Sequence, residues 1–236
     1  ISDLICKGVE PKYYYISGSG NSKSFSSFNL KKISKSLKQE QKKYKILLSG
    51  GDTVFSNKLS FSITSVGFSK KIVLRNKAKL NDDIYVTGNL GDSFAGLQIL
   101  KNKIATSKKL KKYFENKYYQ PTLCFKLTKK LLNIANTSID ISDGLITDLD
   151  KLINKQKLSY KLDLDIVPIS NNLKRLIALK KLNKSSIISR GDDYQVLFTA
   201  DSSKSGIINK TAQSLNIKIS KIGKICAGAQ KHKIIV

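Results

Sequence analysis

The first 70 residues combine segments of helical periodicity with segments of strand periodicity. Apolar residues in the segment 30–45 recur at helical spacing and leave a polar opposite face, which predicts an amphipathic helix. The segment 59–64 alternates strictly between apolar and polar residues, as expected of a half-buried strand. The aromatic segment 13–16 predicts another strand, and 46–48 predicts a short buried strand that runs into the Gly-rich turn 49–53.

From residue 75 onward, strand and helix patterns follow each other without a strict alternation. The expected strands or extended segments are 84–86, 139–144, 162–167, 194–199 and 217–225. The expected helices are 93–101 with Asp92 as N-cap, one that begins at Pro121, 145–153, 173–182 and 206–215. We expect Phe94, Leu97 and Leu100 to share one face of their helix. This mixture, which shows no internal repeat, favours an α+β fold.

The net charge of +26 changes the picture, because it is typical of proteins that bind polyanions. The 43 basic residues divide into 40 Lys and 3 Arg, however, and the Lys residues are spread along the whole chain. Proteins that read phosphates and bases favour Arg, whose planar guanidinium grips phosphate at two points. The charge is therefore interpreted first as background composition, and a functional basic surface is kept as the alternative.

Composition also bears on the environment of the chain. With 40% hydrophobic residues the chain can bury a core, and it has no apolar run of about 18 residues that would predict a membrane span. Three cysteines far apart in sequence predict free thiols in a reducing cytoplasm. Because the chain has no Met and starts at Ile1 within what looks like a structured segment, we expect an internal fragment that lacks both termini of its parent protein.

The residues available for chemistry are mainly carboxylates at Gly-containing or polar turns. With His232 as the single His, a nucleophile activated by His is not expected. Asp residues cluster at five turns, namely Gly51-Asp52, Asp82-Asp83, Gly91-Asp92, the segment Asp140-Ile-Ser-Asp143-Gly144, and Gly191-Asp192-Asp193. Oxygen-only clusters suit Mg²⁺, and neighbouring Gly lets phosphate approach the backbone. Each pair is also an ordinary turn or helix cap, so the magnesium–phosphate interpretation depends on the set as a whole.

These clusters differ in quality as candidates for a shared site, and the pair Asp140 and Asp143 is better than Asp82-Asp83 or Asp92. Asp140 and Asp143 can face one group of ions if the chain turns at Ser142, because positions three apart in an extended segment otherwise point to opposite faces. Asp192 and Asp193 enter a predicted strand, and we expect only one of the two to point into a site.

Taken in order, the motifs resemble those of the thiamine-monophosphate kinase family, within the aminoimidazole-ribotide-synthetase-like superfamily. The matching segments are 2–4 with Gly8 and Pro11, 48–53, 74–78, 83–97, 119–121, 139–145, 167–170, 191–194 and 196–199. The resemblance covers nearly the whole chain, and its most specific parts are Tyr-Val-Thr-Gly at 85–88 followed by Gly-Asp at 91–92, together with Asp-Ile-Ser-Asp-Gly-Leu at 140–145.

The resemblance implies ATP-dependent phosphorylation of thiamine monophosphate to thiamine diphosphate, with several Mg²⁺ ions and no membrane or nucleic-acid partner. By position, the Mg²⁺ ligands would be Asp3, Asp52, Asp140 and Asp143. The ATP-binding residues would be Gly51, Asp52, Arg75 and Ser142, and Asp192 would contact the substrate. The implied fold has two parts, residues 1–72 as the remainder of an N-terminal dimerisation domain and residues 73–236 as a C-terminal α/β domain, in a protein that would be a homodimer.

Some parts of the family pattern are absent from this chain. An N-terminal Gly-Asp-Asp-Ala motif, a Ser/Thr-Asp metal loop and a C-terminal substrate-stacking aromatic are missing, so we expect this chain alone to be inactive. Val54 stands where a second Thr is usual, Arg190 replaces a Gly, and Gln195 replaces a Glu. An arginine beside Asp192 could pair with that carboxylate and weaken its contact with substrate.

Two other functions stay open at this stage. The first is another member of the superfamily, such as a selenophosphate or purine-pathway ATP-dependent enzyme, because Asp-x-Ser-Asp-Gly recurs among such relatives. The second is a basic nucleic-acid-binding module, which would bind with a steep dependence on salt concentration.

Overall fold

The computed structural model describes residues 1–179, 182–228 and 233–235, and the chain divides into two compact units. The first unit comprises Ile1 and Val9–Lys70, and the second comprises Ser2–Gly8 and the chain from Lys71 onward. The sequence led us to expect a boundary after residue 72, whereas the structure separates the units after Lys70 and places Ser2–Gly8 in the second unit. Residues 180–181 of the predicted helix 173–182, and His232, lie outside the described residues.

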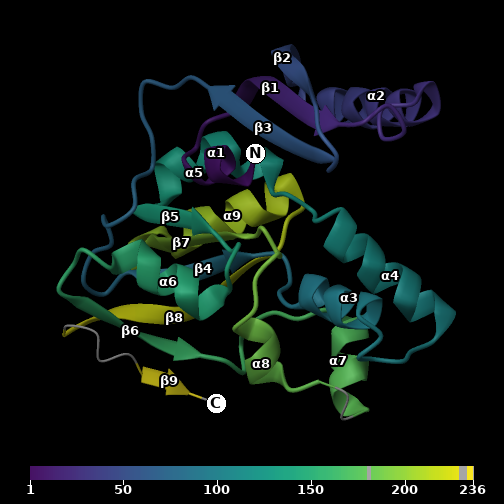
Figure 1. Ribbon diagram of the computed structural model, residues 1–236. Helices are drawn as coiled ribbons and strands as arrows, with labels where there is room; N and C mark the ends of the chain where they lie inside the picture. Colours follow the sequence, from purple (N-terminus) through teal and green to yellow (C-terminus); the bar gives the residue numbers. More distant parts are fainter. Residues whose placement is uncertain (180–181, 229–232, 236) are drawn as a thin grey trace. The chain divides into compact units, whose positions relative to one another are not determined.

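The first unit is a three-stranded sheet with one long helix. It contains β1 (Pro11–Gly20), α2 (Ser27–Tyr44), β2 (Leu47–Phe55) and β3 (Ser60–Gly67), and the strand order is β2-β1-β3 (Figure 1). β1 pairs in parallel with β2 and antiparallel with β3. The parallel pair needs a crossover connection, which α2 supplies. Ser26 caps this helix, because its hydroxyl accepts a hydrogen bond from the backbone N–H of Asn29 at 3.4 Å.

The segment 49–53, which was predicted to be a turn, lies inside β2 instead. Gly51 is paired with Ile16, and Asp52 is paired with Ser17 of β1. A side chain at Gly51 would overlap the backbone carbonyl of Ile16, so Gly permits the close pairing of these two strands. Backbone hydrogen bonds to β1 therefore extend the strand through a segment of low strand propensity.

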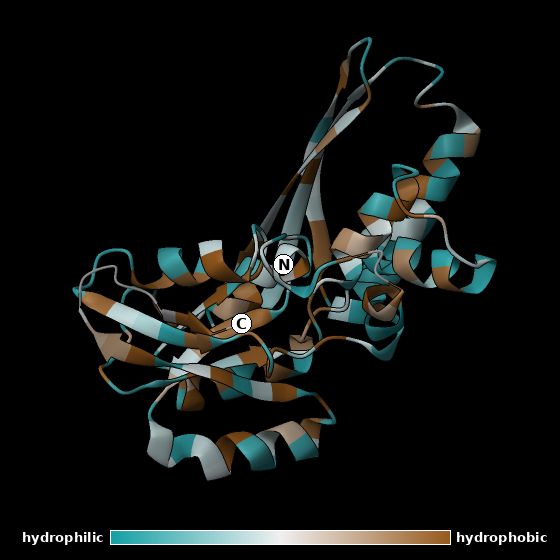
Figure 2. Cartoon of the chain, turned by 90° about the horizontal axis from the view of Figure 1, so that it is seen from below, coloured by the Kyte–Doolittle hydropathy of each residue, from teal (hydrophilic) through white to brown (hydrophobic). Residues whose placement is uncertain are grey.

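Many large apolar side chains along these three strands are exposed within the chain. Hydrophobic segments recur along the strands in Figure 2. The exposed apolar residues of the strands and their ends are Tyr15, Leu47, Leu48, Val54, Phe55, Leu59, Phe61 and Ile63. Apolar surface on this scale is typical of a face that another protein surface covers.

The second unit is built on a six-stranded sheet. Its strands are β4 (Asp83–Thr87), β5 (Thr137–Asp140), β6 (Leu158–Asp163), β7 (Val196–Ala200), β8 (Ile219–Ala227) and β9 (Lys233–Ile235). The strand order is β5-β7-β4-β8-β6-β9, and all neighbours are antiparallel except β6 and β9, which are parallel. Every residue of β4, β5 and β7 is buried, so this part of the sheet is covered on both faces.

Helices surround this sheet. They are α1 (Ser2–Cys6), α3 (Asp92–Leu100), α4 (Lys108–Tyr119), α5 (Thr128–Ile134), α6 (Leu145–Ile153), α7 (Asn171–Ala178), α8 (Lys184–Ile188) and α9 (Ser205–Leu215), with 3₁₀ turns η1 (Phe125–Leu127) and η2 (Ser202–Lys204). α1 packs on β5, β7 and α5, and α5 contacts α9 on the same side of the sheet (Figure 1). Among the described residues, no helix combines the length and the apolar character that a membrane crossing requires.

Two apolar clusters hold the second unit together. The larger one joins α6 to the sheet through Leu145, Leu149 and Leu152, which are fully buried against Val86 and Leu197. The other cluster joins α3, α4, α7 and α8, and its buried members are Ala95, Ile99, Ile104, Phe114, Leu173, Leu176 and Ile187. The larger cluster also contains Ile141 and Leu145 of the predicted motif at the carboxyl end of β5.

The fold class predicted from the sequence, α+β with two parts, is confirmed. The helix at 93–101 is also confirmed, but its N-cap is Gly91 rather than Asp92, and Ala95 and Ile99 are buried more deeply than Phe94. The carboxylate of Asp92 binds distant side chains instead of the helix N-terminus, which explains the difference.

Two other local predictions were wrong, and one helix was missed. The helix expected from Pro121 begins only at Phe125, as a 3₁₀ turn that continues into α5. The strand expected at 162–167 occupies Leu158–Asp163, because pairing with β8 determines its register. The pattern also gave no indication of α4, in which Phe114 is the buried residue.

Candidate active site

The carboxyl end of β5 brings the first group of predicted site residues together. Asp140 is the last residue of β5 and is 4% exposed. The Ser2 hydroxyl of α1 donates a hydrogen bond to Asp140 Oδ2 at 2.7 Å. Arg75 Nη2 lies 3.9 Å from Oδ1 of Asp3, also on α1. The packing of α1 on β5 therefore gathers Asp3, Arg75 and Asp140, which are far apart in sequence.

This group has an electrostatic environment suited to a cation. Burial raises the pKa of the Asp140 carboxyl, the hydrogen bond from Ser2 lowers it, and the negative charge of Asp3 raises it. Lys7 lies in the same region, and its pKa is lowered by burial and by the neighbouring positive charge of Arg75. The Arg75–Asp3 pair is largely exposed and adds little stability, so both residues are available to ligands.

The second group lies on two segments that continue the sheet beyond β5 and β7. Ile141 N–H donates to Gln195 at 2.9 Å, Tyr194 N–H donates to Ile141 at 2.9 Å, and Asp192 N–H donates to Ser142 at 3.0 Å. These backbone hydrogen bonds place Asp192 beside Ser142. Asp192 and Tyr194 have φ angles of 67° and 51°, in a region that residues other than Gly rarely adopt, and such backbone is common at functional sites.

Gly191 makes this pairing possible. A Cβ at this position would overlap the backbone carbonyl of Ser142. We expect Gly191→Ala to push the two segments apart and to destabilise the second unit by about 2 kcal/mol or more, as overpacking does. Urea unfolding monitored by circular dichroism would measure this change.

A second glycine supplies the control for this prediction. Gly206 lies in helix α9, and no atom lies within 4 Å of a Cβ built there. We expect Gly206→Ala to be stabilising by about 0.5–1 kcal/mol, as for an unhindered helical site. Equal effects of the two substitutions would contradict the role of Gly191.

Asp143 and Asp192 have different surroundings from Asp140. The carboxylate of Asp143 is 60% exposed and forms an ion pair with Lys151 of α6. Asp192 Oδ1 accepts a hydrogen bond from the Tyr194 hydroxyl at 3.3 Å. Arg190, which replaces a Gly of the family pattern, places its guanidinium 5.8 Å from the ring centre of Phe94.

Asp192 also lines a cavity of about 370 Å³ in the second unit. The other lining residues are Phe94, Leu97, Gln98, Lys101, Lys103, Arg190 and Gly191. The lining combines an aromatic ring, a carboxylate and several positive charges. Such a surface suits a ligand that has both a ring system and a phosphate.

Asp193 points away from this cavity and into the protein. It is 5% exposed, and its Oδ2 accepts a hydrogen bond from Gly91 N–H at 2.8 Å. Burial raises its pKa to about 7, the hydrogen bond from Gly91 lowers it, and the charge of Asp92 raises it further. The chain thus presents the carboxylate of Asp192 to the 370 Å³ cavity and buries that of Asp193 beside Gly91.

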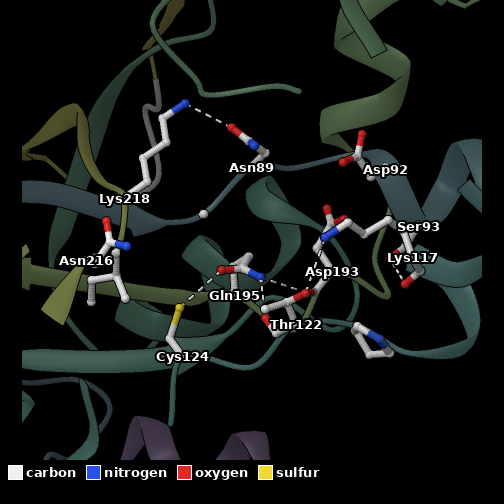
Figure 3. Close-up of a pocket in the computed structure, with 13 residues that line it drawn as sticks. Asn89, Asp92, Ser93, Lys117, Thr122, Cys124, Asp193, Gln195, Asn216 and Lys218 are labelled. Atoms are coloured by element: carbon white, nitrogen blue, oxygen red, sulfur yellow. Dashed lines mark hydrogen bonds between the residues drawn. The ribbon is translucent and has the colours of Figure 1, made fainter. Parts of the chain in front are cut away.

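Asp193 and Gln195 line a separate cavity of about 230 Å³, which Figure 3 shows. Gln195 Oε1 accepts from the Thr87 hydroxyl at 2.9 Å, and its Nε2 donates to the Thr122 carbonyl at 2.9 Å. Asp92 accepts from the Ser170 hydroxyl at 2.6 Å. Gln195 therefore serves the structure here by linking β4 to the loop before η1.

The remaining predicted residues, Gly51 and Asp52, belong to the first unit. Asp52 Oδ1 accepts a hydrogen bond from Thr53 N–H at 2.7 Å, and the whole of β2 is exposed. Among residues 1–179, 182–228 and 233–235, no three side chains of His, Cys, Asp or Glu form a group that could hold a metal ion. The predicted metal and ATP roles of these residues stay predictions.

Two polar residues of the site were missed when the sequence was interpreted. Ser2 was part of a matched motif, but its hydrogen bond to Asp140 depends on the position of α1. Asp148 lies in α6 and is fully buried, with three backbone N–H groups of the loop 142–144 bound to its carboxylate. The sequence feature that could have revealed Asp148 is its position as a charged residue on the apolar stripe of the predicted helix 145–153.

Comparison with known proteins supports the resemblance found in the motifs. Residues 1–69 match the family model described as AIR synthase related protein, N-terminal domain. Thiamine-monophosphate kinase from Haemophilus influenzae is 33% identical over 232 residues, which are 95% of this chain and 68% of that protein. The chain spans about two thirds of the length of the curated relatives that it matches first.

Solved structures show the same fold. Thiamine monophosphate kinase from Aquifex aeolicus matches with a TM-score of 0.88 at 27% identity, covering 100% of this chain and 76% of that one. AaThiL complexed with AMPPCP and TMP matches with a TM-score of 0.88 at 27% identity, covering 99% and 73%. Because the chain is 33% identical to one thiamine-monophosphate kinase over nearly its whole length and shares the fold of another, it belongs to the thiamine-monophosphate kinase family.

Proposed function

We propose that this protein transfers the terminal phosphoryl group of ATP to thiamine monophosphate and forms thiamine diphosphate. The observation that carries the proposal is the gathering of Asp3, Arg75 and Asp140 at the carboxyl end of β5, within a chain 33% identical to a thiamine-monophosphate kinase. One relative of the same fold was solved with AMPPCP, an ATP analogue, and TMP. The 33% identity extends over 95% of the chain, and this favours the kinase function over a basic nucleic-acid-binding module.

The chemistry of the acceptor explains why the site is built of charges rather than of a general base. The attacking oxygen belongs to a phosphate, which is already ionised at neutral pH, so no proton has to be removed. The difficulty is the approach of two anions, since unit charges about 4 Å apart repel by about 4 kcal/mol at an effective dielectric constant of about 20. In this proposal Arg75 and the Ser142 hydroxyl bind ATP in the second unit, and Gly51 is the ATP-binding residue proposed in the first unit.

The carboxylates fit Mg²⁺ as the metal. Mg²⁺ is usually held by one or two protein carboxylates together with waters and substrate phosphates, so a preformed cage of three protein ligands is not required. Asp3 and Asp140 would hold it in the second unit, with Asp143 on the loop that follows Asp140, and Asp52 is the Mg²⁺ ligand proposed in the first unit. When bound, such ions neutralise the phosphate charge and align the two reacting groups.

The cavity beside Asp192 is the proposed place for the thiamine rings. Asp192 can accept a hydrogen bond or bind a positive ring, and Phe94 offers an aromatic face. Because Arg190 lies over Phe94, a ring that stacks there has to share this face with the guanidinium. The free thiols of Cys6, Cys124 and Cys226 support the cytoplasmic location that belongs to this proposal.

The function is tested with the full-length protein, thiamine monophosphate, ATP and Mg²⁺, by direct chromatography of the product. Thiamine diphosphate that forms only when all three are present is the expected result. ATP turnover with a different acceptor would favour another member of the superfamily, and the absence of any turnover would count against a kinase.

We also propose that the protein is a homodimer through the first unit. The supporting observation is the set of large apolar side chains exposed along β1, β2 and β3, which a second copy would cover.

A substitution on β3 tests this dimer. Ile63 is 57% exposed, so a Lys there costs the folded chain little, but it would place a charge in the contact. We expect Ile63→Lys to weaken dimerisation about 10-fold or more in sedimentation velocity. Phe28→Lys on α2, where Phe28 is 65% exposed, is the matched control and should leave the dimer intact. A monomeric unmodified protein would contradict the proposal.

A further inference from the structure

Asp148 has an unusual position for a charged residue. It lies in the first turns of α6 and is 0% exposed. Its Oδ2 accepts hydrogen bonds from the backbone N–H groups of Ser142 and Asp143, both at 2.9 Å, and of Gly144 at 3.1 Å. Its Oδ1 accepts a hydrogen bond from Lys151 Nζ at 3.0 Å. One carboxylate oxygen thus holds three consecutive donors of the loop between β5 and α6.

Three consecutive N–H groups that converge at a helix N-terminus normally form an anion site. Such groups bind phosphate or carboxylate, and the helix dipole adds to the attraction. In this chain an internal carboxylate already occupies them. The N–H groups are therefore not available to a phosphate, or to the carboxylates of Asp140 and Asp143 on the same loop.

The consequence concerns the neighbouring carboxylates. A carboxylate that accepts several backbone hydrogen bonds has fewer lone pairs left for a cation. Because Asp148 takes these N–H groups, the carboxylates of Asp140 and Asp143 are not held by the backbone donors of residues 142–144. Lys151 binds both Asp143 and Asp148, so it links the outer carboxylate to the inner one.

We propose that Asp148 is a positioning residue, which holds the loop 142–144 so that it presents Asp140 and Asp143 to a divalent cation rather than its backbone N–H groups to an anion. The part that concerns the cation rests on the proposed function, whereas the part that concerns the loop does not. Asp148 itself is buried and does not touch the cation or the substrates.

Three substitutions separate this role from general stabilisation of α6. Asp148→Ala removes the acceptor of all three N–H groups, and Asp148→Asn keeps one acceptor oxygen without the charge. Asp150→Ala is the matched control, because Asp150 lies on the same helix and accepts a hydrogen bond from the Tyr160 hydroxyl at 2.8 Å, away from the loop. Amide hydrogen exchange of residues 142–144 is measured by NMR on the metal-free chain, and Mn²⁺ binding is measured by electron paramagnetic resonance.

We expect the loop amides of Asp148→Ala to exchange at least about 100-fold faster, as the loss of hydrogen bonds to a charged acceptor implies, with β5 and α6 still protected. Its Mn²⁺ affinity should fall about 10-fold or more. Asp148→Asn should keep exchange within about 10-fold of the unmodified chain, and Asp150→Ala should change neither quantity in the loop.

Two results would overturn the proposal. One is unchanged loop exchange in Asp148→Ala, and the other is unchanged Mn²⁺ affinity in a variant whose loop exchange has increased. If Asp148→Ala does not fold, Asp148→Asn decides: a measurable increase in loop exchange, up to about 10-fold, with β5 and α6 still protected supports the proposal, and unchanged loop exchange overturns it. Undetectable Mn²⁺ binding by the unmodified chain counts against the proposed metal function, and the exchange rates alone then decide the role of Asp148.

Discussion

In the full-length protein, Asp140→Asn is expected to lower the turnover of thiamine monophosphate about 10³-fold without loss of stability. In the proposed function this carboxylate would hold Mg²⁺, which would offset the repulsion between the phosphates, and the loss of several kcal/mol of charge stabilisation corresponds to about this factor. An Asn side chain still accepts the hydrogen bond from Ser2 through its amide oxygen. Because burial and the charge of Asp3 raise the pKa of Asp140, replacing the charged form with a neutral one does not weaken the fold.

The measurement combines the rate of thiamine diphosphate formation with urea unfolding of the same samples. Asp82→Asn is the control, since Asp82 is a buried carboxylate at the opposite end of β5 that binds Asn136 at 2.9 Å and Thr199 at 2.8 Å. The control should lower stability, because an amide nitrogen faces these donors, and should keep the rate per folded molecule close to normal. Near-normal turnover of Asp140→Asn would remove Asp140 from the proposed metal site.

Periodicity predicted the elements whose sequence follows one simple pattern. The helix at 145–153 was predicted correctly because its apolar stripe faces a single sheet. β3 was predicted because apolar and polar residues alternate along it, although its residues are exposed or half-buried rather than alternately buried. α4 escaped because it is rich in Lys and buries little apart from Phe114. β6 was displaced because Leu164 and Val167 are buried beyond the end of the strand, so their hydrophobicity extended the apparent strand.

The residues of the candidate site were identified by their motifs, but their arrangement was not accessible from the sequence. Ser2 meets Asp140 across 138 positions, and this contact exists because α1 packs on β5. Asp148 was missed for a different reason. A hydrophobic stripe defines the buried face of a helix, and a carboxylate on that face is informative only when its backbone partners in the preceding loop are known.

The second large effect concerns the pH dependence of stability, which we expect Asp193→Asn to flatten between pH 4 and pH 7. Asp193 has a pKa of about 7 in the folded chain, because of burial and then of the charge of Asp92, against an ordinary value of about 3.8. In this interval the folded state binds more protons than the unfolded state, so the free energy of unfolding falls as the pH rises. The stability contribution of the protonated carboxyl is complete below about pH 4 and is lost as the pH rises through about 7.

The size of this effect follows from the shift. A difference of about three pKa units corresponds to roughly 4 kcal/mol, lost at about 1.4 kcal/mol for each pH unit. Burial also raises the pKa of Asp92, and the charge of Asp92 raises the pKa of Asp193, so Asp193→Asn removes the repulsion between these two carboxylates. The Asn variant should therefore gain roughly 4 kcal/mol relative to the unmodified chain between pH 4 and pH 8.

Urea unfolding at half-unit steps from pH 4.5 to pH 8 measures this difference. Asp201→Asn is the control of opposite sign, because hydrogen bonds from Ser203 lower the pKa of Asp201 on the protein surface. A lowered pKa contributes stability that is present above the ordinary value and is lost only at lower pH, so this variant should differ from the unmodified chain by a constant amount from pH 5 to pH 8. If the profiles of Asp193→Asn and Asp201→Asn run parallel across this range, the Asp193 carboxyl is ionised throughout, and the buried pair with Asp92 does not control the pH dependence of the second unit.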